Sequence, residues 1–436
     1  MLKSAFTEFK SFQLVTGVAL AAGIALLGVP RSAQALSYGI YEPRGLAMGG
    51  TGVAVASFHQ AQYYNPALLA LNDESENTSR DSRFVFPNIV LQIDDAAQDI
   101  VDAADDNLQE NLELAVQAYN ANPSQTTAGD VATRARDLQR LLLDLGNKQV
   151  DGELVAGLSV SVPSLLEGGA FFLNSRSISV ADSSIPAADF ALLESYISAL
   201  ETVASGGDLS TIPPELLDAN GNLIDPTDSF NSSAQITAYS IFEWGVSLSK
   251  QFDFFGQGLA VGVTPKVLRV LAINDSTDFG DDELEFDSDE QSYLSMNADL
   301  GVAFQLFENY RIALAAKDLI PEKFTTSSGA ELQIKPRMRM GLAYVHDYVS
   351  VGLDYDLGEN EPTAFEAATQ DASFGLEISP WSFLDLQLGY RQDLTGFRED
   401  TMSGGVAFRL KRFAVELSYA KSDTVTSGGL QFGWIF

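Results

Sequence analysis

Cysteine is absent from the 436 residues, and only two histidines, His59 and His346, are present. A chain without cysteine forms no disulfide, and it offers no thiolate nucleophile or zinc–cysteine site. Two histidines are too few for a histidine-rich metal centre. Basic residues are also scarce, because 26 lysines and arginines stand against 59 acids, which gives a formal net charge of -33. This charge repels phosphate backbones, so we predict no nucleic-acid partner.

Long apolar runs are missing after the first 35 residues. The early run from Phe12 to Val29 follows Lys3 and Lys10, and residues 33–35 have the small-x-small form of a cleavage site. We predict a signal peptide over residues 1–35, cleaved after Ala35, and the alternative is a membrane anchor. Later stretches are too short or too polar for a membrane helix, so any membrane crossing must be made by strands.

Apolar and polar residues alternate repeatedly in the second half of the chain. One such segment places Leu384, Leu386, Leu388 and Tyr390 on one face and Asp385, Gln387, Gly389 and Arg391 on the other. The polar faces mix small residues with scattered charges, as in the lumen of a barrel, whereas a soluble sandwich has uniformly polar outward faces. The apolar faces end in aromatic residues suited to a membrane interface, namely Tyr344, Tyr355, Tyr390 and Tyr419.

The alternating segments add up to about fourteen strands, an even number typical of outer-membrane barrels. They cover residues 84–93, 153–163, 169–181, 234–250, 257–272, 290–306, 309–319, 332–346, 348–357, 370–379, 382–393, 401–410, 412–421 and 428–436. Short turns alternate with long loops, and closure pairs every backbone group that would otherwise be exposed to hydrocarbon. We therefore predict an all-β membrane barrel of antiparallel strands.

Two long connections have the apolar spacing of helices rather than strands. Residues 94–147 predict a helical hairpin, and residues 187–204 predict a shorter helix. They lie within the long loops 94–152 and 182–233, which the alternation of turns places on the extracellular side. Their apolar stripes need a partner, which is each other, the barrel mouth, or a second protein.

Residues 44–70 are rich in glycine and contain a Tyr-Asn-Pro-Ala sequence. No Gly-Lys-Ser/Thr follows, so this is not a phosphate-binding loop. The segment resembles the hatch of the FadL-type long-chain fatty-acid transporter superfamily. The form of the run and the helical insertion after the first strand resemble the conjugal-transfer TraF-like outer-membrane family. The resemblance implies a hatch, residues 36–82, inside a barrel formed by residues 83–436, with the hatch motif Gly49, Gly50, Asn65, Pro66 and Ala67.

The last strand ends in an aromatic series at the final residue. This series resembles the C-terminal signature by which outer-membrane barrels are recognised for assembly, and its residues are Phe432, Trp434 and Phe436. The resemblance implies location in the outer membrane of a Gram-negative bacterium, with the assembly machinery and outer-membrane lipid as partners.

Basic residues on the predicted lumen face are candidates for ligand binding. They are Arg311, Lys317, Arg337 and Arg339. Arg337 and Arg339 are adjacent inward positions suited to a carboxylate head group, and the alternative is ion pairing that holds the hatch to the wall. The loop 275–290 is strongly acidic, and Asp281, Asp282, Glu283 and Asp287 are candidate calcium ligands. Its spacing matches no complete ion-binding loop, so a solvated acidic loop is the alternative.

No nucleophile with a base and an orienting group can be assembled from the spacing, so we predict a non-enzyme without a cofactor.

Two functions follow from these observations. The FadL-like resemblance implies a porin-like passive channel for hydrophobic or amphipathic molecules such as long-chain fatty acids. A break in alternation at residues 171–174 is then a candidate gap in the wall. The TraF-like resemblance implies instead a surface scaffold or partner-binding component, linked to conjugal transfer or secretion.

Overall fold

The computed structural model describes residues 33–34, 36–71, 82–97, 108–146, 149–162, 168–208, 212–278, 289–325, 329, 331–361 and 367–436. The predicted signal peptide lies outside the described residues, apart from residues 33–34. The candidate calcium ligands Asp281, Asp282, Glu283 and Asp287 lie outside them as well.

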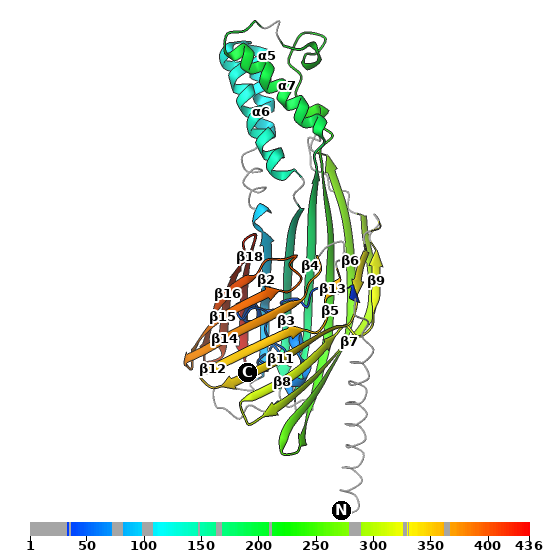
Figure 1. The fold of residues 1–436 in the computed structure, drawn as a ribbon, viewed down its shortest axis with the longest axis vertical. Helices are drawn as coiled ribbons and strands as arrows, with labels where there is room; N and C mark the ends of the chain where they lie inside the picture. Colours follow the sequence, from blue (N-terminus) through cyan, green and yellow to red (C-terminus); the bar gives the residue numbers. More distant parts are fainter. Residues whose placement is uncertain are drawn as a thin grey trace, which may run out of the picture.

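Fourteen antiparallel strands form a closed barrel, which confirms the predicted fold class (Figure 1). The first and last strands of the barrel pair with each other and close it. The strands are β2 (Arg83–Asp94), β3 (Gln149–Val162), β4 (Gly168–Ser184), β5 (Ser233–Phe254), β6 (Gln257–Asp278), β7 (Asp289–Leu306), β8 (Tyr310–Lys317), β11 (Arg337–His346), β12 (Val349–Asp356), β14 (Asp371–Trp381), β15 (Leu384–Asp393), β16 (Thr401–Leu410), β17 (Phe413–Lys421) and β18 (Val425–Ile435).

The outer surface of the barrel is apolar, and the inner surface is largely polar. In β15, Leu386 and Leu388 are exposed, whereas Asp385 and Gln387 are buried at 5% and 2% exposure. Aromatic side chains gather on the outside near the short turns, and they are Phe254, Phe255, Phe307, Tyr310, Tyr348, Trp381, Phe383, Phe413, Trp434 and Phe436. An apolar wall with an aromatic girdle fits hydrocarbon and its interface, so the barrel spans a membrane.

Three helices stand beyond the barrel at the end opposite the short turns (Figure 1). They are α5 (Leu108–Ala121), α6 (Gln125–Leu145) and α7 (Ala187–Ala204). Ser124 begins α6 with a reciprocal capping box to Thr127. The apolar stripes pack against one another in a core separate from the barrel. No helix in the described part of the chain is both long enough and apolar enough to cross a membrane.

Residues 36–71, called the hatch below, lie inside the barrel. They contain α2 (Pro43–Ala47), α3 (Ala61–Tyr64) and the 3₁₀ helix η1 (Pro66–Leu69). Nearly every hatch residue is buried, and the hatch shares one hydrophobic core with lumen-facing residues of the wall. The remaining short elements are β1 (Ala33–Gln34), β13 (Asn360–Glu361), η3 (Pro214–Leu216) and η4 (Thr227–Ser229).

Two details differ from the strands predicted from sequence. The segment 332–346 is divided, because β10 (Glu331–Ile334) pairs with β9 (Glu322–Thr325) in a separate two-stranded sheet and β11 begins after Pro336. Proline lacks the N–H that a continuous ladder requires, which explains the division. Strands β5 and β6 also continue past the predicted ends at residues 250 and 272, to Phe254 and Asp278.

The predicted break in alternation at residues 171–174 is wrong. Strand β4 pairs continuously with both neighbours, and Phe171 and Leu173 point outward while Phe172 is buried. The Phe172 ring meets the Tyr63 ring of the hatch edge-on, with centroids 5.7 Å apart. A lumen filled by a hatch offers apolar contacts, so an apolar residue is stable on the inner face. The wall therefore has no gap at this position.

Candidate functional site: the hatch and the lumen around it

The Asn-Pro-Ala motif forms the start of η1 and joins it to the wall. The Asn65 Oδ1 atom accepts a hydrogen bond from the Ala67 N–H at 3.0 Å, and Pro66 occupies the first helical position. Asparagine is favoured at the N-cap because its side chain accepts a hydrogen bond from a backbone N–H that has no partner within the helix. Proline is favoured at the first helical position because it has no N–H that would need such a partner. The Asn65 Nδ2 atom donates to the carbonyls of Val53 and Val302, at 2.9 and 3.3 Å. Both functional groups of Asn65 are therefore engaged.

The glycine-rich run forms α2 and the turn that follows it. Glu42 caps α2 by accepting hydrogen bonds from the N–H groups of Arg44 and Gly45, at 2.8 and 2.6 Å. Gly49 and Gly50 have φ angles of +68° and +87°, a region that favours glycine. The Gly49 N–H donates to Ser403 Oγ of β16 at 3.1 Å, so the turn is attached to the wall.

Glycines of the wall allow the hatch backbone to approach it closely. A Cβ atom added at Gly301 would lie 1.9 Å from Asn65 Oδ1, and one added at Gly389 would lie 2.1 Å from the Gly49 nitrogen. Similar close approaches to hatch atoms occur around the lumen, and we call these wall residues the glycine belt: Gly168, Gly262, Gly301, Gly341, Gly352, Gly375, Gly389 and Gly405. The belt fits the hatch closely, with no room for side chains at these positions.

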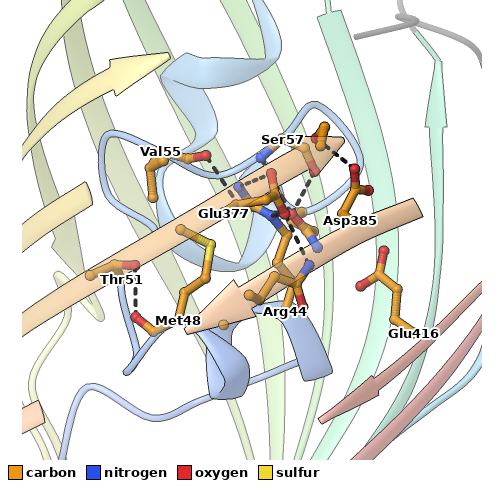
Figure 2. Close-up of polar contacts among 12 residues, drawn as sticks. Arg44, Met48, Thr51, Val55, Ser57, Glu377, Asp385 and Glu416 are labelled. Carbon is orange, nitrogen blue, oxygen red and sulfur yellow. Dashed lines mark hydrogen bonds and ion pairs between the residues drawn. The ribbon is translucent and has the colours of Figure 1, made fainter. Parts of the chain in front are cut away.

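Arg44 of the hatch forms a two-point ion pair with Glu377 of β14. The Nε–Oε2 distance is 2.7 Å and the Nη2–Oε1 distance is 3.0 Å. Figure 2 shows the Arg44 side chain directed toward Glu377. Gln387 of β15 donates to the same carboxylate at 2.9 Å, and the Arg44 Nη1 atom donates to the Val55 carbonyl at 3.3 Å. Hatch and wall are thus joined by a buried, charge-assisted contact.

The four basic residues singled out from the sequence are all buried on the lumen side of the barrel. Arg339 contacts Asp356 with Nη2–Oδ2 at 2.9 Å, and its Nη1 donates to the Gly50 carbonyl at 3.3 Å. Three of the four donate to hatch carbonyls, which are Gly50 O for Arg339, Leu36 O and Ser37 O for Arg337, and Tyr63 O for Lys317. Arg311 lies on the lumen face of β8. Hatch attachment is therefore the role that these contacts display.

Tyrosine rings of the hatch lie against two of these cations. The Lys317 Nζ atom is 3.8 Å from the centre of the Tyr41 ring, and the Arg339 guanidinium carbon is 4.2 Å from that of Tyr38. Such cation–π contacts strengthen when water is excluded. No pattern in the sequence predicts these contacts, because the hatch tyrosines follow neither a helical nor a strand period.

A second ionic cluster surrounds Lys266 of β6. Its Nζ atom lies 3.2 Å from Glu243, 3.0 Å from Asp299 and 2.6 Å from Asp318. Asp318 also pairs with Arg337, which links the cluster to the hatch. Asp318 follows the end of β8 with φ at +56°, a placement that strand periodicity does not predict. In the described parts of the chain, histidine and carboxylate side chains form no group suited to a metal ion.

The three residues of the predicted assembly signal lie on the outside of the barrel, near the short turns. Phe432 and Trp434 point outward from β18, and Phe436 follows it. The Trp434 ring packs edge-on against Phe413, with centroids 4.7 Å apart. The Phe436 N–H donates to the Ser82 carbonyl at 2.9 Å, next to the start of β2.

The sequence model of a protein family described as "F plasmid transfer operon, TraF, protein" matches residues 62–356. The chain belongs to this TraF family. The match begins in the hatch and ends at the last residue of β12, so it includes the Asn-Pro-Ala motif and the helical insertion. No curated protein matches the chain in sequence.

Among solved structures, two similar barrels cover nearly the whole length of this TraF-family chain. A mutant of the monoaromatic hydrocarbon channel TodX has 10% sequence identity and a TM-score of 0.47, covering 91% of this chain and 99% of that one. A FadL homologue from Pseudomonas aeruginosa has 10% identity and a TM-score of 0.46, covering 90% of this chain and 97% of that one.

Proposed function

We propose that this TraF-family protein is a bacterial outer-membrane channel for passive uptake of small hydrophobic or amphipathic molecules. The observation that carries the proposal is a cavity of about 180 Å³ between the hatch and the loop end of the lumen. Its wall combines apolar side chains such as Ile40 and Val90 with charged ones such as Arg391. Ligand sites use both kinds of group, because apolar side chains exclude water and polar groups orient the ligand.

The hatch is suited to the role of a gate because its contacts with the barrel wall are noncovalent and can therefore rearrange. Hydrogen bonds and ion pairs from Ser403, Glu377, Lys317 and Arg339 attach it to the wall. A molecule in the cavity reaches the short-turn end after these contacts rearrange. We propose as a second route the bulge at Phe86 and Pro87, where the pairing of β2 shifts register against both β3 and β18.

Uptake by whole cells tests this function, because the outer membrane is the barrier that a channel relieves. A deletion strain and the strain carrying the restored protein are compared for uptake of labelled toluene, octanoate and oleate. We expect the restored strain to accumulate at least one of these compounds faster. Equal uptake of each of the three compounds by the two strains, with the barrel present in the outer membrane of the restored strain, would contradict the proposal.

A surface scaffold that binds an envelope partner, linked to conjugal transfer or secretion, is the second candidate. The bundle of α5, α6 and α7 favours it, since the bundle has its own core and stands clear of the barrel (Figure 1). A photo-crosslinking residue at Leu143, which is 59% exposed on α6, tests this role. Capture of one envelope protein in cells, together with unchanged uptake after deletion, would favour the scaffold over the channel.

A further inference from the structure

The cavity between the hatch and the loop end of the lumen has a lining formed by both parts of the protein. Hatch residues Ile40 and Leu46 form one side, and Val90 of β2 and Ile178 of β4 add further apolar surface. Phe397 belongs to the loop between β15 and β16 and also lines the cavity. The cavity is therefore apolar over much of its wall.

The loop carrying Phe397 is organised around the carboxylate of Asp393. The Asp393 Oδ2 atom accepts hydrogen bonds from the N–H groups of Phe397 and Arg398, at 3.0 and 3.2 Å. The Thr395 hydroxyl donates to the same oxygen at 2.6 Å, and its oxygen lies 3.0 Å from the Ala368 carbonyl. This wall of the cavity is consequently organised before any ligand arrives.

Most charges around the cavity are already neutralised by protein partners. Arg398 pairs with Asp371 at 2.6 Å. Glu153 accepts two hydrogen bonds from Arg176, at 2.8 and 3.1 Å. Arg339 pairs with Asp356, at the floor of the same cavity. Asp151 lies at the exposed rim.

Arg391 of β15 is the exception among the cavity arginines. Its one hydrogen bond is a long contact of 3.4 Å from Nη2 to the Thr401 hydroxyl, and within the described ranges it has no ion pair. A guanidinium carries five N–H donors, and most of those on Arg391 face no protein acceptor. A carboxylate accepts from two of these donors at once, which gives the strongest pairing available to arginine.

We propose that this cavity binds a small amphipathic carboxylate, with the acid group on Arg391 and a single ring or short chain against Ile40, Leu46 and Val90. The proposal rests on the uptake function above and narrows its substrate class. An apolar cavity of about 150 Å³ admits one benzene molecule. A cavity of about 180 Å³ therefore suits a benzoate-sized acid better than the whole tail of a long-chain fatty acid.

Calorimetry on the purified full-length protein in detergent tests the site, with sodium benzoate as the probe. The neutral isostere benzamide and the long-chain acid palmitate are the comparison ligands. We expect Arg391→Gln to weaken benzoate binding about tenfold or more, because a charge-assisted pair is lost. The matched control Arg412→Gln removes an exposed arginine at a short turn and is expected to bind benzoate like the wild type.

Three outcomes would overturn the proposal: no benzoate binding to the wild type, equal binding by Arg391→Gln and wild type, or Arg391-dependent binding of palmitate in preference to benzoate. Phe397→Ala provides a second variant should Arg391→Gln not fold, and it is expected to weaken benzoate binding by removing the ring of the loop wall. Cell uptake separates the two proposals. If cells take up the compounds but benzoate binding does not depend on Arg391, the channel function stands and the proposed carboxylate site is wrong. If benzoate binding depends on Arg391 but cells show no uptake, the site stands and the channel function is wrong.

Discussion

Arg44 and Glu377 are 333 positions apart in the sequence and form a two-point ion pair across the boundary between hatch and wall. Their side chains are 7% and 14% exposed, so the pair is almost completely withdrawn from water. A buried pair of this kind is costly to break on one side only, because the remaining charge stays buried without a partner. The pair therefore makes the attachment of the hatch testable by single and double substitutions.

Arg44→Gln is expected to destabilise the seated hatch by about 3 kcal/mol, since it leaves the Glu377 carboxylate without its cation. The double variant Arg44→Gln/Glu377→Gln should recover much of this loss. Urea titration of the protein in micelles, together with conductance in planar bilayers, measures stability and leakage. Arg412→Gln is the control. A double variant no better than Arg44→Gln would show that the pair does not act as a unit.

Gly389→Ala is expected to prevent normal seating of the hatch, because the new Cβ would lie 2.1 Å from the Gly49 nitrogen. Overpacking of this kind costs about 2 kcal/mol, or more where the backbone cannot move. Gly428→Ala is the matched control, since a Cβ there meets nothing within 4 Å. Both variants can be compared by the temperature at which the folded band is lost on a gel. Identical behaviour of the two would contradict the close fit of the glycine belt.

Asn65→Asp separates the two functions of the Asn-Pro-Ala motif. An aspartate still accepts from the Ala67 N–H, but it cannot donate to the Val53 and Val302 carbonyls. We expect Asn65→Asp to loosen the hatch at least as much as Asn65→Ala, because its buried carboxylate would face the Val53 and Val302 carbonyls. Asn65→Ala loses the same donors and a cap worth about 1 kcal/mol, but it buries no charge. Limited proteolysis of the hatch measures the effect. An aspartate variant as resistant as wild type would show that the cap alone matters.

Leu193→Ala is expected to unfold the helical bundle without unfolding the barrel. Leu193 is fully buried in the core shared by α5, α6 and α7, and deletion of such a side chain costs about 3 kcal/mol. Leu143→Ala, at a residue 59% exposed on α6, is the matched control. Circular dichroism at 222 nm follows the helices, while heat-dependent gel mobility follows the barrel. Loss of both signals together would show that the bundle is not an independent unit.

Strand periodicity predicted all fourteen barrel strands, because one face of each strand must match lipid along its whole length. It predicted the ends of strands less well. The end of β6, Ile273 to Asp278, is polar and does not alternate, so periodicity does not predict it. The division before β11 occurs at Pro336. The proline can be seen in the sequence, but the pairing of β10 with β9, which separates β10 from β11, cannot.

The interior was less predictable than the wall. A strict alternation of apolar and polar residues describes a strand whose inner face meets water. Phe172 departs from this alternation because Tyr63 of the hatch covers it and excludes water from that part of the wall. The sequence predicts the arginines and lysines of the lumen, because strand alternation places these charged residues on the inner face. Their partners were not found, since hatch carbonyls and Asp318 are brought to them only by the path of the chain through the barrel.

The tight fit between hatch and glycine belt sets an order of events during maturation. Atoms of the hatch occupy the space beside wall backbone on strands from β4 to β16. If the barrel closed first, the folded hatch would have to slide along the lumen past wall backbone that leaves it no clearance. We therefore expect the hatch to be in position before β18 pairs with β2, so that closure of the barrel and filling of its lumen occur together during biogenesis.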